Sequence, residues 1–204
     1  GVKARKHPGG MIDLSQGTPV DPTPEFIQKV LAQSANSPSY PTTAGTPELQ
    51  EAIRAWAISH LGISGDFDVL PVIGSKELVA WLPTFLQSHT VLYPKVAYPT
   101  YLVGAMLAQS QEIAVDIDAS QWPQADLAWV NSPANPTGRV HSQDELRAVI
   151  QWSRTHKAVV ISDECYLEFG DGVTPTSIFA YSDGDNTNLL AVHSLSKRSS
   201  LAGY

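Results

Sequence analysis

The sequence has little of several features that mark particular classes of protein. A single cysteine, Cys165, occurs among the 204 residues, which excludes a disulfide framework within the chain and favours a reducing, cytoplasmic location. Lysine and arginine number 13 against 20 acidic residues, and the net charge of −7 argues against nucleic acid as a partner. No apolar run could span a bilayer, so we expect no membrane partner, and residues 1–10 lack the apolar core of a signal peptide.

Metal-binding patterns and internal repeats are missing as well. The six histidines show no spacing typical of metal ligands, so we expect no metal and place most of them on the surface. No repeat, low-complexity tract or charged linker divides the chain. What remains is a composition with 43% hydrophobic and 16% charged residues, which is typical of a soluble globular protein.

The hydrophobic pattern alternates between helix and strand periodicity. Continuous apolar runs such as residues 158–161 and 189–192 suit strands that helices bury on both faces. Ser142 and Glu145 form a capping-box pattern at a helix start. The alternation predicts a three-layer α/β fold with a mostly parallel sheet and helices on both faces. Helices are expected at 24–33, from 46 onward, and at 77–86, 101–108 and 144–153, with strands at 69–73, 90–93, 112–115, 127–130, 158–161 and 189–192.

Polar side chains gather just after four of the predicted strands. In an open α/β sheet, ligands bind beyond the carboxyl ends of the strands, so these positions are the first candidates for a functional site. The clusters are Gly74-Ser75-Lys76-Glu77, Asn131-Ser132-Pro133, Asp163-Glu164-Cys165-Tyr166 and His193-Ser194-Leu195-Ser196-Lys197.

Each cluster has a chemical interpretation and an ordinary structural one. Gly74 precedes a helix start whose free N–H groups favour phosphate, although a plain strand-to-helix turn is the alternative. Asp163 could cap a helix, bind a metal or pair with a buried cation such as a protonated pyridine nitrogen, and Tyr166 is near enough to serve the same site. Lys197 could hold a phosphate, act as a covalent amine or be a solvated surface lysine.

Asn135 and Cys165 are two further candidates near the predicted strand ends. The loop 131–138 contains two prolines and a glycine, which would present Asn135 in one orientation, although the loop by itself is equally a turn. Cys165 has no histidine or asparagine partner in a motif, so we interpret it as a small buried residue beside the site and not as a nucleophile.

Three motifs in order carry a family resemblance. They are Asn-Pro-x-Gly at 135–138, Asp-x-x-Tyr at 163–166 and Ser-x-Ser-Lys at 194–197, with Gly-Ser-Lys-Glu at 74–77 upstream. Together they resemble the class I/II aminotransferases, the fold-type I pyridoxal 5'-phosphate (PLP) enzymes, from about residue 14 to 204. The resemblance implies an extended N-terminal segment at 1–24 and, at 25–204, an incomplete PLP-binding large domain without the small C-terminal domain.

The resemblance assigns chemistry to the matched residues. Lys197 would form a Schiff base with PLP and later move a proton between the substrate α-carbon and C4′ of the cofactor. Asp163 would pair with the pyridine nitrogen and keep it protonated, while Tyr166 and Asn135 would hydrogen-bond the phenolic oxygen. Lys197, Asp163 and Tyr166 are therefore the expected catalytic residues.

The remaining assignments concern the phosphate, the ring and the substrate. The backbone amides of Ser75 and Lys76, together with Ser194, would hold the phosphate. Tyr98 would stack on the pyridine ring. Gly17 would lie beside the substrate carboxylate, and Asn135 would contact the substrate as well.

The resemblance also bears on assembly and substrate. Tyr40 matches a tyrosine that reaches the cofactor phosphate of a neighbouring subunit, which implies a homodimer with shared sites. The segment 194–204 is similar to succinyldiaminopimelate aminotransferases, which implies glutamate as amino donor and N-succinyl-2-amino-6-oxopimelate of lysine and diaminopimelate biosynthesis as acceptor. The sequence stops at Gly203-Tyr204, where family members continue into an arginine that binds the phosphate, so we expect the chain to be a fragment.

Other functions remain open. The apolar run ending in Asp163-Glu164 and the turn Gly74-Ser75-Lys76 vaguely resemble an ATPase-like domain, but the phosphate-loop pattern G-x-x-x-x-G-K-[ST] is absent. A non-catalytic PLP-fold regulatory module and a different PLP activity, such as a C–S lyase, both retain the same motifs.

Overall fold

The computed structural model describes residues 6–10, 17 and 19–203. The chain forms two compact units. Residues 36–194 make the larger one, and residues up to 35 together with 195–204 make the smaller one. Each unit is described separately below.

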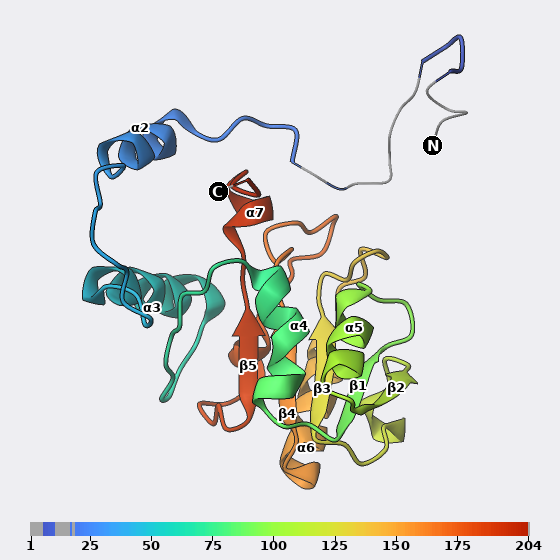
Figure 1. Cartoon of the computed structure of the whole chain (residues 1–204). Helices are drawn as coiled ribbons and strands as arrows, with labels where there is room; N and C mark the ends of the chain where they lie inside the picture. The colour runs from blue at the N-terminus through green and yellow to red at the C-terminus, as the bar shows by residue number, and fades with distance from the viewer. Residues whose placement is uncertain (1–5, 11–16, 18, 204) are drawn as a thin grey trace. The chain divides into compact units, whose positions relative to one another are not determined.

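The larger unit contains a five-stranded sheet in the order β2-β1-β3-β4-β5 (Figure 1). Every neighbouring pair of strands is parallel, so all five carboxyl ends lie at one edge. At that edge Asn131 pairs with Asp163, and Asp163 pairs with Val192. The strands are β1 (Thr90–Pro94), β2 (Gln111–Val115), β3 (Leu127–Asn131), β4 (Val159–Asp163) and β5 (Leu189–Val192).

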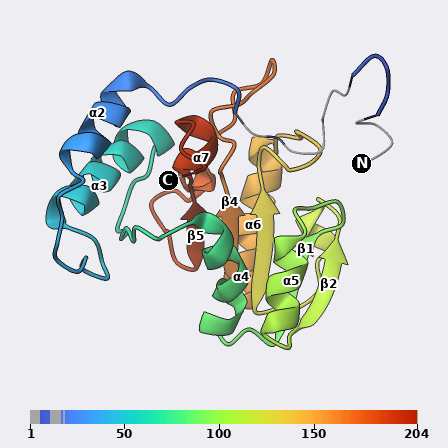
Figure 2. The ribbon, with the colours of Figure 1, turned by 45° about the horizontal axis from the view of Figure 1, so that its top comes forward.

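Helices cover both faces of this sheet, as the sequence predicts (Figure 2). On one face, α4 (Ser75–Phe85) and α5 (Thr100–Leu107) pack against Val91, Trp129 and Ile161. Gly104 lets these two helices approach closely, because a Cβ there would lie 3.0 Å from the Ala80 carbonyl oxygen.

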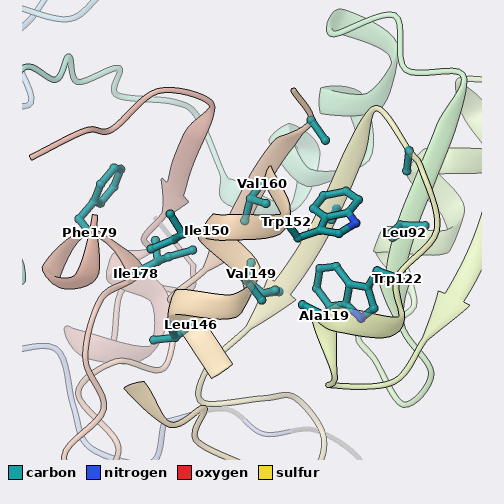
Figure 3. Packing of buried hydrophobic residues seen from close by; sticks show 14 of the residues in the cluster. Leu92, Ala119, Trp122, Leu146, Val149, Ile150, Trp152, Val160, Ile178 and Phe179 are labelled. Atoms are coloured by element: carbon teal, nitrogen blue, oxygen red, sulfur yellow. The ribbon is translucent and has the colours of Figure 1, made fainter. Parts of the chain in front are cut away.

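The opposite face is buried by α3 (Pro47–Leu61), α6 (Gln143–His156) and the 3₁₀ turns η1 (Ala119–Gln121) and η2 (Ile178–Tyr181). Figure 3 shows this core, in which the Trp122 and Trp152 rings meet edge to face at 5.4 Å. The sheet is therefore the middle of three layers, and the α/β prediction is confirmed.

Local sequence signals explain where several helices begin. The Thr46 side chain accepts a hydrogen bond from the Leu49 N–H, and Pro47 occupies the first turn of α3. The predicted capping box of Ser142 and Glu145 is present in both directions at the start of α6. These caps satisfy N–H groups that the helix itself leaves without partners.

One predicted strand is wrong. Residues 69–73 form no strand, although their apolar pattern favours one. A strand needs a neighbour for its backbone hydrogen bonds, and no other described residues pair with this segment. Leu70 and Ile73 are accordingly exposed at 65% and 96%.

The smaller unit contains α2 (Glu25–Gln33) and the short α7 (Leu195–Arg198). Pro24, predicted as an early helical residue, is instead the residue that precedes the first turn of α2. The Thr23 hydroxyl donates to the Ser200 carbonyl oxygen at 2.8 Å and links the two parts of this unit. The division into an extended segment at 1–24 and a domain at 25–204 stays a prediction, and residues 1–5, 11–16 and 18 of that segment lie outside the described residues.

Candidate active site

Asp163 is a buried carboxylate at the carboxyl edge of the sheet in the larger unit. It ends β4 and is only 7% exposed. Its Oδ2 accepts a hydrogen bond from the Tyr101 hydroxyl at 2.7 Å, and its Oδ1 accepts one from the Cys165 backbone N–H at 3.2 Å. Each carboxylate oxygen can accept a second bond, so the group can still receive another donor.

Tyr101 lies on α5 and is fully buried. Burial is the main cause that raises the pKa of Tyr101 well above its ordinary value, and the charge of Asp163 raises it further. Tyr101 therefore remains protonated and donates to the carboxylate. Its ring stacks on Trp129 at 4.8 Å with an interplanar angle of 19°, which fixes the direction of the hydroxyl.

Two other tyrosines surround this pair. The Tyr98 ring meets Tyr101 edge to face at 5.8 Å and 83°. Burial raises the pKa of Tyr166, with smaller contributions from Cys165, Asp163 and Tyr98. The structure thus brings together Asp163, Tyr98 and Tyr166, three of the residues that the motifs predict for one site.

Asn131 links the Asn-Pro-x-Gly loop to β4. Its Nδ2 donates to the Asp163 carbonyl oxygen at 2.8 Å and to the Pro133 carbonyl oxygen at 3.1 Å. Its Oδ1 accepts from the Asn135 backbone N–H at 2.7 Å. Because Asn131 is almost fully buried, these bonds determine where the loop presents Asn135.

A cavity of about 280 Å³ adjoins this loop. Its lining includes Asn135 and Trp129, which the site already contains, and the cationic side chains of Lys95 and Arg139. The cavity therefore touches the site on the side of β1 and β3. Asp163 does not line it.

The start of α4 has the local features expected of an anion site, and its role stays a prediction. Gly74 precedes the helix with φ of +84°, a conformation that favours glycine, and no side chain caps the first turn. The N–H groups of Ser75 and Lys76 belong to that first turn, where no backbone acceptor of the helix reaches them. An anion is favoured there by these donors and by the positive end of the helix dipole.

Lys197 belongs to the smaller unit, where it lies on α7. Its Nζ donates to the Gly17 carbonyl oxygen at 2.5 Å. Two residues predicted for the same site, one for the cofactor and one for the substrate carboxylate, are therefore in contact.

Two other predicted residues, Ser194 and Tyr40, are described by their burial. Ser194 is half-buried and follows β5 closely in the larger unit. Tyr40 is fully exposed. Its predicted role toward a neighbouring subunit stays a prediction. Among the described residues no cluster of His, Cys, Asp or Glu could hold a metal ion, and no helix in that part of the chain is long and apolar enough to cross a membrane.

Sequence reasoning missed three contributors to this site. Tyr101 and Asn131 carry the hydrogen bonds that orient Asp163 and Asn135. Tyr101 occurs within an apolar stretch, and the polar cluster 131–133 predicts no role for Asn131 itself. His193 belongs to the polar cluster after the last predicted strand, but the sequence assigns it no role, and it is half-buried against Glu164. A polar residue inside an otherwise apolar helix is the signal that could have found Tyr101.

Comparison with known proteins identifies the family of this chain. The model of the family described as aminotransferase class I and II matches residues 9–204. The chain belongs to this family, whose members depend on PLP. The predicted family resemblance is thereby confirmed.

Particular relatives extend the match over almost the whole chain. A probable aminotransferase of Mycobacterium tuberculosis is 50% identical over 98% of this chain and 50% of its own length. The 4-dedimethylamino-4-oxo-anhydrotetracycline transaminase OxyQ of Streptomyces rimosus is 45% identical over 99% of this chain and 58% of its own length. The chain thus spans about half the length of the curated relatives that it matches.

A solved structure matches as well. The crystal structure of aminotransferase AspB from Helicobacter pylori has a TM-score of 0.85 at 30% identity, over 94% of this chain and 57% of that one. The large-domain fold of a PLP-dependent aminotransferase is therefore the fold of this chain.

Proposed function

We propose that the protein containing this chain is a PLP-dependent aminotransferase that moves an amino group between an amino acid and an oxo-acid. The observation that carries the proposal is the buried carboxylate of Asp163, held at the carboxyl end of β4 by the Tyr101 hydroxyl at 2.7 Å. Such a carboxylate suits a protonated pyridine nitrogen, the electron-accepting end of PLP.

The residues of the larger unit fit this cofactor. Asp163 would receive the pyridinium N–H, and Tyr98, whose ring meets that of Tyr101, would stack on the pyridine ring. Tyr166 and Asn135 would donate to the phenolic oxygen. The uncapped first turn of α4 at Ser75 and Lys76, with Ser194, would hold the phosphate.

Lys197 would carry the covalent attachment and the proton transfer. PLP, once bound, supplies an electron sink that makes the α-hydrogen of an amino acid removable. The Lys197 amine, released when the substrate amine replaces it, would then accept that proton and return it to the cofactor carbon. The contact with the Gly17 carbonyl supports a lysine held near the part of the chain predicted to face the substrate carboxylate.

The substrate and assembly are finer proposals. We propose glutamate as donor and N-succinyl-2-amino-6-oxopimelate as the acceptor, on the likeness of segment 194–204 to succinyldiaminopimelate aminotransferases. We also propose a homodimer in which the exposed Tyr40 reaches the partner's phosphate site, and a cytoplasmic location, which the single cysteine supports.

The test uses the complete gene product. The protein is incubated with PLP, its visible spectrum is recorded, and a panel of oxo-acids is offered with glutamate as donor. We expect a new absorption band that the Lys197→Ala variant lacks, and formation of 2-oxoglutarate with at least one acceptor.

The outcomes separate the rival functions. A band without transfer to any acceptor would overturn the transaminase proposal, and release of sulfide and pyruvate from cysteine would replace it with a C–S lyase. A band with neither reaction favours the regulatory module. No band, or an equal band in the Lys197→Ala variant, removes PLP from the account.

A further inference from the structure

Glu164 is a buried acid that the proposed chemistry does not use. It follows Asp163 directly, and its side chain is 1% exposed. Successive residues of an extended chain point to opposite faces, so Asp163 turns toward Tyr101 while Glu164 turns toward the core beneath α3 and α6. Its Oε1 accepts a hydrogen bond from the Ile178 backbone N–H at 2.9 Å.

The second oxygen of Glu164 faces His193. Glu164 Oε2 lies 3.2 Å from His193 Nε2, and neither atom has a hydrogen bond of good geometry among the described residues. The contact therefore sets an imidazole nitrogen against a carboxylate oxygen inside the fold. A buried carboxylate oxygen with no other partner is costly, so the pair resists separation.

The pair joins the ends of two strands at the candidate site. Glu164 follows β4, and its backbone N–H donates to the Val192 carbonyl oxygen at 2.9 Å. His193 is the first residue after β5. On its other side the His193 ring meets Trp56 of α3 edge to face at 5.0 Å and 80°. The imidazole is thus held between α3 and β4 just where the chain leaves the sheet.

We infer that Glu164 and His193 are positioning residues that fix Ser194 relative to Asp163. The inference rests on the proposed function, in which Asp163 receives the ring nitrogen and Ser194 holds the phosphate. Each of these two residues is the immediate chain neighbour of one member of the pair. The pair therefore sets the spacing between the ring-nitrogen end and the phosphate end of the cofactor site.

The inference predicts a selective loss of phosphate recognition. In the complete gene product, dissociation constants are measured for PLP and for pyridoxal, which lacks the phosphate. For His193→Ala we expect PLP to bind roughly tenfold more weakly, the scale known for losing the hydrogen-bond partner of a metal ligand. Pyridoxal affinity should stay within about twofold, because it makes no use of Ser194.

Further variants distinguish positioning from folding. His193→Gln keeps a donor near Nε2 and should restore most of the PLP affinity. Ser194→Ala should reproduce the selective loss and should not add to His193→Ala, because both remove the same interaction. The matched control is His156→Ala. His156 also lies against a tryptophan, Trp152 at 5.1 Å, but it ends α6 before the opposite end of β4.

Each outcome decides the inference. A preference for PLP over pyridoxal that falls in His193→Ala and not in His156→Ala supports it. Equal weakening of both ligands, additive effects with Ser194→Ala, or no change in either ligand overturns it. If the unsubstituted protein binds neither ligand, the proposed function itself fails, and this inference fails with it.

Discussion

Replacing Tyr101 by phenylalanine tests the hydrogen bond that carries the functional proposal. The substitution removes one oxygen atom and keeps the ring that stacks on Trp129 at 4.8 Å. It deletes the 2.7 Å bond to Asp163 Oδ2 at a site where Tyr101 is fully buried and Asp163 is 7% exposed. Few water molecules can replace the lost donor there.

The expected loss follows from the nature of the bond. Hydrogen bonds to a charged group contribute about 1.5–3 kcal/mol, and an unsatisfied buried acceptor adds to the cost. We therefore expect the free energy of unfolding to fall by about 2 kcal/mol in Tyr101→Phe, as measured by urea denaturation of the complete gene product. PLP should also bind more weakly, because the carboxylate that would receive the pyridinium is less well oriented.

The alkaline limb of the stability profile provides a second readout of the same change. Burial and Asp163 raise the pKa of Tyr101 above its ordinary value of 10.0, so the folded state keeps a proton that the unfolded state loses. This contribution to stability is complete below that ordinary pKa and is lost progressively as the pH rises above it. The phenylalanine variant should lose less stability in this range than the unsubstituted protein.

A control and a contrary result complete this prediction. Tyr93→Phe on β1 removes a hydroxyl for which no hydrogen bond is described within residues 19–203, and it should change stability by less than about 0.5 kcal/mol. If Tyr101→Phe were as stable as the Tyr93 control and bound PLP equally well, the Tyr101 hydroxyl would not support Asp163, and the reasoning would be wrong.

Three smaller predictions concern the end of β3, the loop after it and the helix that follows. Burial lowers the pKa of His141 to about 4, so the folded state favours the neutral imidazole. Stability should therefore fall as the pH drops from about 6.5 toward 4. In His141→Asn, the melting temperature should depend less on pH over this range. Ser142→Ala removes the cap that accepts from the Glu145 N–H, which should cost about 1 kcal/mol in chemical denaturation. Asn131→Ala should release Asn135, and it should reduce the free energy of PLP binding more than the free energy of unfolding. Equal reductions of the two free energies would contradict the role of Asn131 in holding the loop.

Much of the fold follows from sequence because its signals are local. Apolar runs such as 189–192 and the Ser142 cap appear in the structure as predicted. Residues 69–73 show where local signals fail. Their pattern favours a strand, but a strand requires a partner, and the described residues supply none.

The candidate site also contains residues that local signals predict and residues that they do not. Asp163 and Asn135 could be predicted, because parallel strands bring their carboxyl ends to one edge and the motifs follow those ends. Tyr101 and His193 could not, since their roles depend on which face of a helix or strand end meets a particular carboxylate. Such contacts join residues far apart in the sequence, and no spacing encodes them.

The most direct measurement is the site of covalent attachment. The complete gene product is incubated with PLP, reduced with borohydride, digested, and its peptides are weighed by mass spectrometry. We expect one reduced cofactor per chain, carried by the peptide that contains Lys197, and none on that peptide in the Lys197→Ala variant. Attachment at another lysine, or at no lysine, would contradict the role proposed for Lys197.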